Sequence, residues 1–114
     1  MPYLMIQTNQ TIDAEKTRTL MSNASRTVAE LLGKSENYVT IAVLPAMPMM
    51  FAGSDAPLAY LALKSIDLPE STTPDLSQSL CHLINNELNI PMNRIYIEFS
   101  NAQRHLWGWN GRTF

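Results

Sequence analysis

The sequence predicts an α+β fold in which two β-α-β units form one four-stranded mixed sheet with both helices on one face. Three observations predict it. Two segments have apolar residues at helical spacing, each lies between two segments of strand pattern, and the second half of the chain repeats the first. The chain of 114 residues is expected to be a single domain, with the two units at 1–57 and 58–114.

The first unit begins with an apolar strand over residues 3–6. Thr11 is expected to cap the helix that follows, because a hydroxyl oxygen accepts hydrogen bonds from unpaired amides at a helix start. Gly33 ends the helix, and alternating residues over 39–43 predict a second strand, which Pro45 closes. The buried stripe of the helix is formed by Leu20, Ala24, Val28 and Leu31.

The second unit begins with a continuous apolar strand over residues 58–66. Thr73 is expected to cap the second helix, with Pro74 at the first helical position, where a missing amide costs nothing. Residues 95–99 alternate and predict the last strand, which leads into a closing segment at 101–114. The buried stripe of this helix is formed by Leu76, Leu80, Ile84 and Leu88.

The two units can be aligned in register. Similar side chains recur at one constant spacing, with Leu32, Asn37, Val39, Ile41 and Val43 matching Leu88, Asn93, Ile95, Ile97 and Phe99. A unit of this size buries too little surface to be stable alone, so the two units are expected to share one sheet. Right-handed crossovers would make the two strands within each unit parallel.

One face of this sheet lacks a cover. The strands at 3–6 and 58–63 are apolar at successive positions, and therefore on both faces of the sheet, whereas two helices cover only one face. The methionine-rich segment 46–53 and the tryptophan-bearing segment 101–114 also need burial. The sequence therefore predicts an obligate homo-oligomer.

The composition argues against several classes of function. The net charge is −2 and no basic cluster indicates a nucleic-acid or anionic-membrane partner. No apolar stretch is long enough to span a membrane and no segment resembles an export signal, so no membrane insertion and a cytoplasmic location are expected. Cys81 has no partner for an internal disulfide, and the few cysteine and histidine residues lack metal-ligand spacing, so no metal is expected.

The candidate catalytic residue is Pro2. Within a chain the prolyl nitrogen is a tertiary amide, but removal of Met1 would leave a secondary amine that can take up and release a proton. At the tip of a buried strand this amine loses hydration, which lowers the pKa of an amine and favours the free base. The alternative is an ordinary strand start, because many proteins begin with Met-Pro and use neither residue in catalysis.

Short motifs along the whole chain together resemble the macrophage migration inhibitory factor family of the tautomerase superfamily. They are Met1-Pro2, Thr8-Asn9, Leu32-Gly33-Lys34 before Tyr38, Gly53-Ser54 with Pro57, Ser65-Ile66, Arg94-Ile95-Tyr96-Ile97, Gly108-Trp109-Asn110 and Thr113-Phe114. The resemblance implies a β-α-β repeat that closes into a homotrimer with three active sites at subunit interfaces.

The resemblance also implies a reaction, which is keto–enol tautomerisation of phenylpyruvate-type or dopachrome-type substrates without a cofactor. Pro2 would be the general base. Lys34 would bind the carboxylate or carbonyl of the substrate and stabilise the enolate charge as it develops, and the backbone of Ile66 would line the site.

The neighbouring subunit would complete the pocket with Tyr96, Glu98 and Trp107. Aromatic walls from these tyrosine and tryptophan residues, together with Tyr3 and Tyr38, would suit a flat, aryl-bearing substrate. Trp109 is interpreted as a packing anchor.

Two positions depart from the family pattern. Glu98 stands where mammalian members commonly have asparagine, and its carboxylate would repel an acidic substrate, tie up Lys34 or raise the pKa of the proline. Trp107 replaces a small aliphatic residue and would narrow the site. The segment 58–61 contains no cysteine, so the thiol-redox activity known in this family is not expected.

Two other functions stay open. The first is a signalling ligand, released without a signal peptide and recognised by a cell-surface receptor, with a weak or vestigial tautomerase site. Ala46 and the segment 10–12 lack the charged pair associated with receptor binding in the family, which disfavours this function. The second is a noncatalytic oligomer that binds small molecules because Glu98 suppresses the base.

Overall fold

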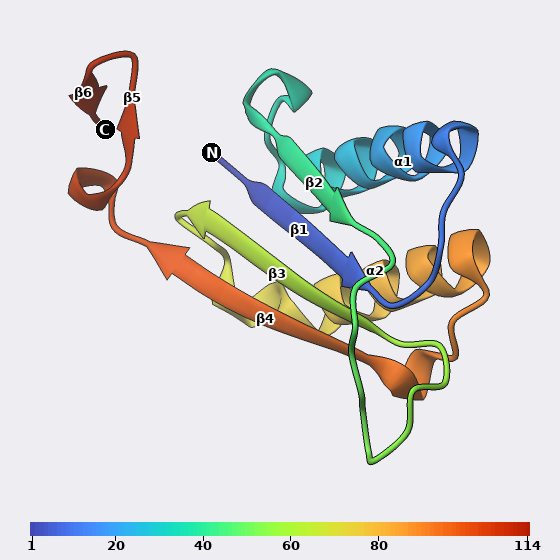
Figure 1. Ribbon diagram of the computed structural model, residues 1–114. Helices are drawn as coiled ribbons and strands as arrows, with labels where there is room; N and C mark the ends of the chain where they lie inside the picture. Colours follow the sequence, from blue (N-terminus) through green and yellow to red (C-terminus); the bar gives the residue numbers. More distant parts are fainter.

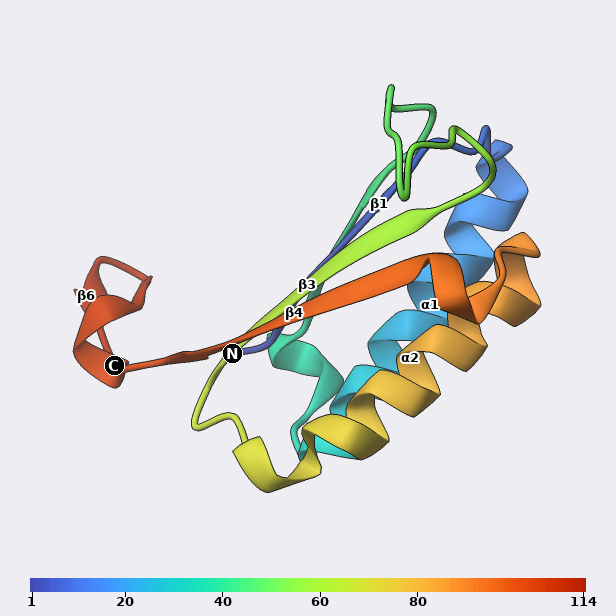
Figure 2. The ribbon, with the colours of Figure 1, turned by 90° about the horizontal axis from the view of Figure 1, so that it is seen from below.

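The structure is a computed structural model that describes residues 1–114. A four-stranded sheet forms one layer and two long helices form the other (Figures 1 and 2). The strand order is β2-β1-β3-β4. The strands are β1 (Tyr3–Thr8), β2 (Thr40–Leu44), β3 (Ala59–Ile66) and β4 (Ile95–Ala102), and the helices are α1 (Ala14–Leu32) and α2 (Thr73–Leu88). The predicted α+β fold with a mixed sheet and both helices on one face is confirmed.

The two predicted units appear in the pairing of the strands. β1 pairs with β2 in parallel and β3 pairs with β4 in parallel, as right-handed crossovers require. The units join through the antiparallel pair β1–β3, where Leu4 lies opposite Leu63 and Ile6 lies opposite Leu61. The two central strands thus come one from each unit.

The predicted caps of both helices were wrong by one or two residues. The N-cap of α1 is Asp13, whose carboxylate oxygen Oδ1 accepts a hydrogen bond from the amide of Lys16 at 2.7 Å. A carboxylate here also complements the positive end of the helix dipole, which the hydroxyl of Thr11 would not do. The N-cap of α2 is Thr72, so Thr73 is the first helical residue. Gly33 ends α1 as predicted, with φ of 63° in the left-handed region.

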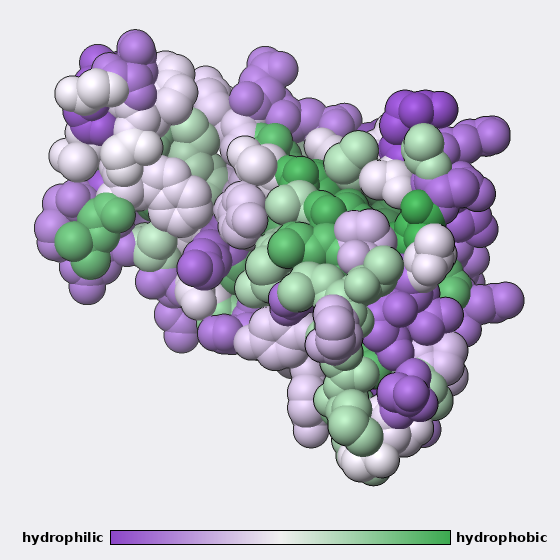
Figure 3. Space-filling model, viewed as in Figure 1, coloured by the Kyte–Doolittle hydropathy of each residue, from purple (hydrophilic) through white to green (hydrophobic).

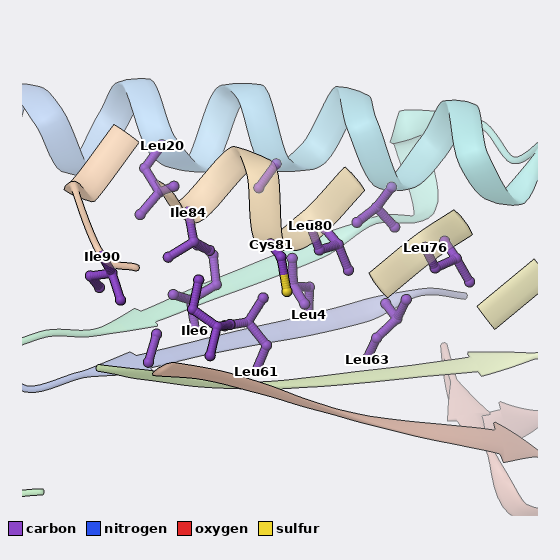
Figure 4. Packing of buried hydrophobic residues seen from close by; sticks show 14 of the residues in the cluster. Leu4, Ile6, Leu20, Leu61, Leu63, Leu76, Leu80, Cys81, Ile84 and Ile90 are labelled. Carbon is purple, nitrogen blue, oxygen red and sulfur yellow. The ribbon is translucent and has the colours of Figure 1, made fainter. Parts of the chain in front are cut away.

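The core lies between the helices and the sheet (Figure 4). Leu4 and Ile6 of β1 and Leu61 and Leu63 of β3 are fully buried. They pack against side chains from both helices and from the segment after α2, chiefly Leu20, Leu76, Leu80, Cys81, Ile84 and Ile90. The predicted stripe residues Leu31 and Leu88 are half-buried at its margin.

The opposite face of the sheet is uncovered. Along β1, fully buried residues alternate with the half-buried Tyr3, Met5 and Gln7, which point to this face. Figure 3 shows hydrophobic residues gathered over it. Tyr96 on β4 has 62% of its surface exposed. An uncovered apolar face of this extent is typical of a subunit interface.

The closing segment projects from the end of β4, beyond the sheet (Figures 1 and 2). A 3₁₀ turn, η4 (Arg104–Leu106), leads into a small hairpin of β5 (Gly108–Trp109) and β6 (Arg112–Thr113). It lies at the same end of the sheet as the N-terminus (Figure 1). Neither α1 nor α2 combines the length and the apolar character that a membrane-spanning helix needs.

Candidate functional site

A cavity of about 330 Å³ lies where the start of the chain, the end of α1, the end of β3 and the closing segment meet. Its walls are formed by Met1, Lys34, Ser35, Tyr38, Ile66, Arg104, Trp109 and Phe114. A neighbouring hollow of about 230 Å³ shares Met1, Tyr38 and Trp109 and adds Pro2 and Trp107. Of the residues predicted to form the site, the fold therefore gathers Pro2, Lys34, Tyr38, Ile66 and Trp107 at one end of the sheet.

Lys34 reaches the cavity because Gly33 ends α1 in a left-handed turn. The amide of Lys34 donates to the carbonyl of Ala29, which closes the turn, and its ammonium nitrogen Nζ donates to the carbonyl oxygen of Ile66 at 2.7 Å. An ammonium group has three donors, so two remain for a bound anion. Ile66 is the last residue of β3, so this hydrogen bond also joins the helix end to the strand end.

Pro2 is fully buried immediately before β1. Its carbonyl oxygen accepts a hydrogen bond of 3.0 Å from the amide of Thr40, which fixes the start of the chain to the start of β2. While Met1 is attached, the nitrogen of Pro2 is an amide and cannot act as a base.

The amine of Met1 reports on the electrostatics of the cavity. Burial lowers the pKa of this amine, the positive charge of Lys34 lowers it further, and Arg104 acts in the same direction. The carboxylate of Asp67 opposes them by raising the pKa. The cavity therefore favours the uncharged form of an amine that lies in it.

Sequence reasoning missed two charged residues at this site. Nη2 of Arg104, in η4, lies 2.9 Å from Oδ2 of Asp67, which directly follows β3. Asp67 has φ of 54°, in the left-handed region that few residues other than glycine adopt. Neither residue belongs to a motif, and the path of the closing segment brings them together, so the sequence offered no signal for the pair.

The aromatic walls differ in part from the expected ones. Trp109, expected to be a packing anchor, lines the cavity and stacks on Phe114 with 6.0 Å between the ring centroids. Trp107 was expected from a neighbouring subunit, yet it lies beside Pro2 of its own chain, because η4 turns the closing segment back toward the N-terminus. Tyr3 points to the uncovered face of the sheet and lines neither hollow.

Tyr96 and Glu98 lie elsewhere in the chain, on the exposed side of β4. The ring of Tyr96 packs edge to face on the ring of Phe51, with 4.8 Å between the ring centroids, beside the methionine-rich segment. Glu98 accepts a hydrogen bond of 2.8 Å from the hydroxyl of Tyr60, and this bond is the main reason that the pKa of Tyr60 is raised. Within one chain, Glu98 therefore pairs with Tyr60 and leaves Lys34 free.

No three histidine, cysteine, aspartate or glutamate side chains come together in a way that would hold a metal ion. Both histidines, His82 and His105, are exposed, and Cys81 is buried in the core. The chemistry available to the cavity is thus that of an amine, a lysine, an arginine and an aromatic wall.

Comparisons with known proteins agree on one family. The family model described as "Macrophage migration inhibitory factor (MIF)" matches residues 1–114. A macrophage migration inhibitory factor homolog of Brugia malayi is 38% identical over 115 aligned positions, which cover 100% of this chain and 99% of that protein. Macrophage migration inhibitory factor of Xenopus tropicalis is 34% identical over 115 aligned positions, which again cover 100% of this chain and 99% of that protein.

Solved structures agree as well. The crystal structure of a macrophage migration inhibitory factor homologue from Prochlorococcus marinus is similar to this chain, with a TM-score of 0.93, 40% sequence identity and 98% of each chain covered. The structure of the factor from Trichinella spiralis has a TM-score of 0.90 and 34% identity, with 98% of this chain and 99% of that chain covered.

Proposed function

The chain belongs to the macrophage migration inhibitory factor family, and on that premise we propose that it is a keto–enol tautomerase whose general base is Pro2, freed by removal of Met1. The proposed substrates are small keto acids or their enols, of the phenylpyruvate or dopachrome type. The proposed catalytic assembly is a homotrimer.

The observation that carries this proposal is the surroundings of the N-terminus. Pro2 is held in place at the edge of a cavity that lowers the pKa of an amine, and Lys34 lines the same cavity. A neutral secondary amine can accept a proton at neutral pH, which a hydrated ammonium group cannot do. Burial and a nearby positive charge thus supply what a proline base needs.

The reaction would proceed in two proton transfers. The nitrogen of Pro2 takes a proton from the carbon next to the substrate carbonyl, and the electron pair of that carbon–hydrogen bond moves into the carbonyl to form an enolate. The ammonium of Lys34 stabilises the negative charge on the enolate oxygen as it develops. Return of a proton to that oxygen completes the enol and restores the base, and the reverse sequence ketonises an enol.

An oligomer would cover the uncovered face of the sheet and complete the site. The fold of this family suggests an oligomeric assembly, and the apolar face over β1 and β3 supplies a surface for it. In the proposed homotrimer, Tyr96 and Glu98 of a neighbouring copy would face the cavity, which explains why both lie away from the cavity of their own chain.

The test begins with the intact mass of the purified protein and an assay of phenylpyruvate tautomerisation on the same sample. We expect Met1 to be absent and turnover to be present. Pro2→Gly should lower kcat/KM by about 10²- to 10⁴-fold, the range that a general base contributes, with the oligomer preserved in size-exclusion chromatography.

The matched control is Pro91→Gly, a proline-to-glycine change at an exposed position between α2 and β4, which should leave turnover unchanged. Retention of Met1 in an active protein, or full activity in Pro2→Gly, would overturn the role of Pro2. Absence of turnover with several keto acids in protein that lacks Met1 would overturn the tautomerase itself and favour a ligand that acts on a receptor.

A further inference from the structure

The cavity presents positive charge from two different walls. Lys34 follows the end of α1, whereas Arg104 belongs to η4 in the closing segment, and both line the same 330 Å³ space. The positive charges of both also lower the pKa of the Met1 amine, which lines the same cavity.

From this arrangement we propose that Arg104 determines substrate specificity by binding a second carboxylate, so that the site favours keto diacids over keto monoacids. This inference rests on the proposed function, because it concerns the substrate class of the same site. Lys34 would bind the group next to the reacting carbon, and Arg104 would bind the far carboxylate.

The charges of the two cations are balanced only in part. Within the chain, Lys34 bonds to the neutral carbonyl of Ile66, and the one salt bridge is that of Arg104 with Asp67. Counted over the residues of one chain, the cavity therefore has one positive charge without a counter-ion, and two when a ligand displaces Asp67. A keto monoacid neutralises one charge, and a keto diacid neutralises both.

Asp67 is suited to act as an exchangeable counter-ion. The side chains of Arg104 and Asp67 are 64% and 65% exposed, and an ion pair that is so well hydrated contributes little to stability. Exchanging the carboxylate of Asp67 for a carboxylate of the substrate therefore costs little. The contact with Arg104, which lines the cavity, is what places this carboxylate next to it.

The arginine side chain is suited to binding a substrate carboxylate. Its planar guanidinium donates two parallel hydrogen bonds to one carboxylate, whereas an ammonium acts as a point charge. The volume of the cavity lies at the low end of the range for small-molecule sites, which suits a short diacid.

The experiment compares oxaloacetate, a keto diacid, with phenylpyruvate, a keto monoacid, on the native oligomer that lacks Met1. The measured quantity is the ratio of the two kcat/KM values, oxaloacetate over phenylpyruvate. It is measured at a pH at which kcat/KM of every variant no longer rises with pH. Arg104→Gln should lower this ratio about 10- to 100-fold, the effect of losing a charge-assisted hydrogen bond. Asp67→Asn should raise the ratio, and Arg18→Gln, on the exposed side of α1, should leave it unchanged.

An unchanged ratio in Arg104→Gln would overturn the proposal, as would an equal loss with both substrates. A second measurement separates this result from failure of the proposed function. Calorimetric titration with succinate, an unreactive diacid, needs no turnover, and Arg104→Gln should weaken its binding about tenfold or more. If the native protein turns over neither keto acid but Arg104→Gln weakens succinate binding, the proposed tautomerase activity is wrong and the proposed role of Arg104 is supported. If succinate binds both proteins equally, the role of Arg104 falls.

Discussion

Lys34 donates a hydrogen bond of 2.7 Å to the carbonyl oxygen of Ile66, and this contact joins the C-terminal end of α1 to the end of β3. The two residues are 32 positions apart in the chain. Because the carbonyl is neutral, it holds the ammonium at the wall of the cavity without cancelling its charge. In the proposed tautomerase, Lys34 would therefore be in position before the substrate binds, so its electrostatic contribution would need no reorganisation.

We expect Lys34→Met to lower kcat/KM for phenylpyruvate by about 10²- to 10³-fold, because the apolar stem is kept while the charge that stabilises the enolate is lost. Lys16→Met is the matched control, since Nζ of Lys16 also bonds to a backbone carbonyl, that of Glu87, at 3.0 Å. The measurement is steady-state kinetics of both variants. Equal activities in the two variants would rule out a catalytic role for Lys34.

The pH dependence follows from the charges around the N-terminus, whose effects on the pKa of the Met1 amine should act in the same directions on the amine of Pro2 once Met1 is removed. A base acts in its deprotonated form, so kcat/KM rises with pH through the pKa of the base, and a lowered pKa moves this rise to lower pH. Lys34→Met removes a charge that lowers the pKa, so the rise should move to higher pH. Asp67→Asn removes a charge that raises the pKa, so the rise should move to lower pH. Shifts of both variants in the same direction would contradict this assignment.

Glu98→Gln should lower the pKa of the Tyr60 phenol toward its ordinary value. The raised pKa depends first on the hydrogen bond to Glu98, and an uncharged amide stabilises the neutral phenol less than a carboxylate does. Ultraviolet difference spectra recorded against pH follow the tyrosinate. Tyr60→Phe identifies the signal, because it removes the contribution of this phenol from that of the four tyrosines.

A second substitution at residue 98, Glu98→Asn, tests whether the carboxylate of Glu98 suppresses the proposed base. If it does, Glu98→Asn raises turnover of phenylpyruvate, since a negative charge that favours the protonated amine has been removed. Unchanged or lower turnover in Glu98→Asn would count against suppression. Circular dichroism and size-exclusion chromatography of the variant serve as the check that the assembly is intact.

Arg94 should be important for stability rather than for catalysis. Its guanidinium donates to the carbonyl oxygens of Phe51, Ser54, Ala56 and Pro57 and lies 5.2 Å from the ring centroid of Phe51. Arg94→Ala would remove the four hydrogen bonds that tie the start of β4 to the segment 51–57, so the free energy of unfolding should fall by about 2–4 kcal/mol. Urea unfolding at one fixed protein concentration measures it, and Arg18→Ala, which is exposed, should change it by less than about 0.5 kcal/mol.

The fold was predictable from the sequence because its signals are local and repeated. Apolar periodicity located both helices and all four long strands, and the register between the two units predicted a shared sheet. The helix caps were less predictable, because the choice between Thr11 and Asp13 depends on how the chain leaves β1, where the carbonyl of Gln10 accepts a hydrogen bond from the amide of Ala46. That contact links distant segments and leaves no local pattern.

The site was predictable only in part. Lys34 and Ile66 lie in short motifs next to the ends of regular elements, so the family resemblance could place them. Arg104 and Trp109 belong to a segment without helical or strand periodicity, so no local pattern predicts its course beyond β4. The surroundings of Tyr96 and Glu98 in an assembly depend on a second copy, which no pattern within one chain describes.

Met1 and Phe114 both line the cavity, so the first and last residues meet at the candidate site. Any extension attached at either residue starts at the wall of the cavity, and an affinity tag there would obstruct it or bury the amine in a peptide bond. The position of the tag therefore decides whether an assay can detect activity at this site.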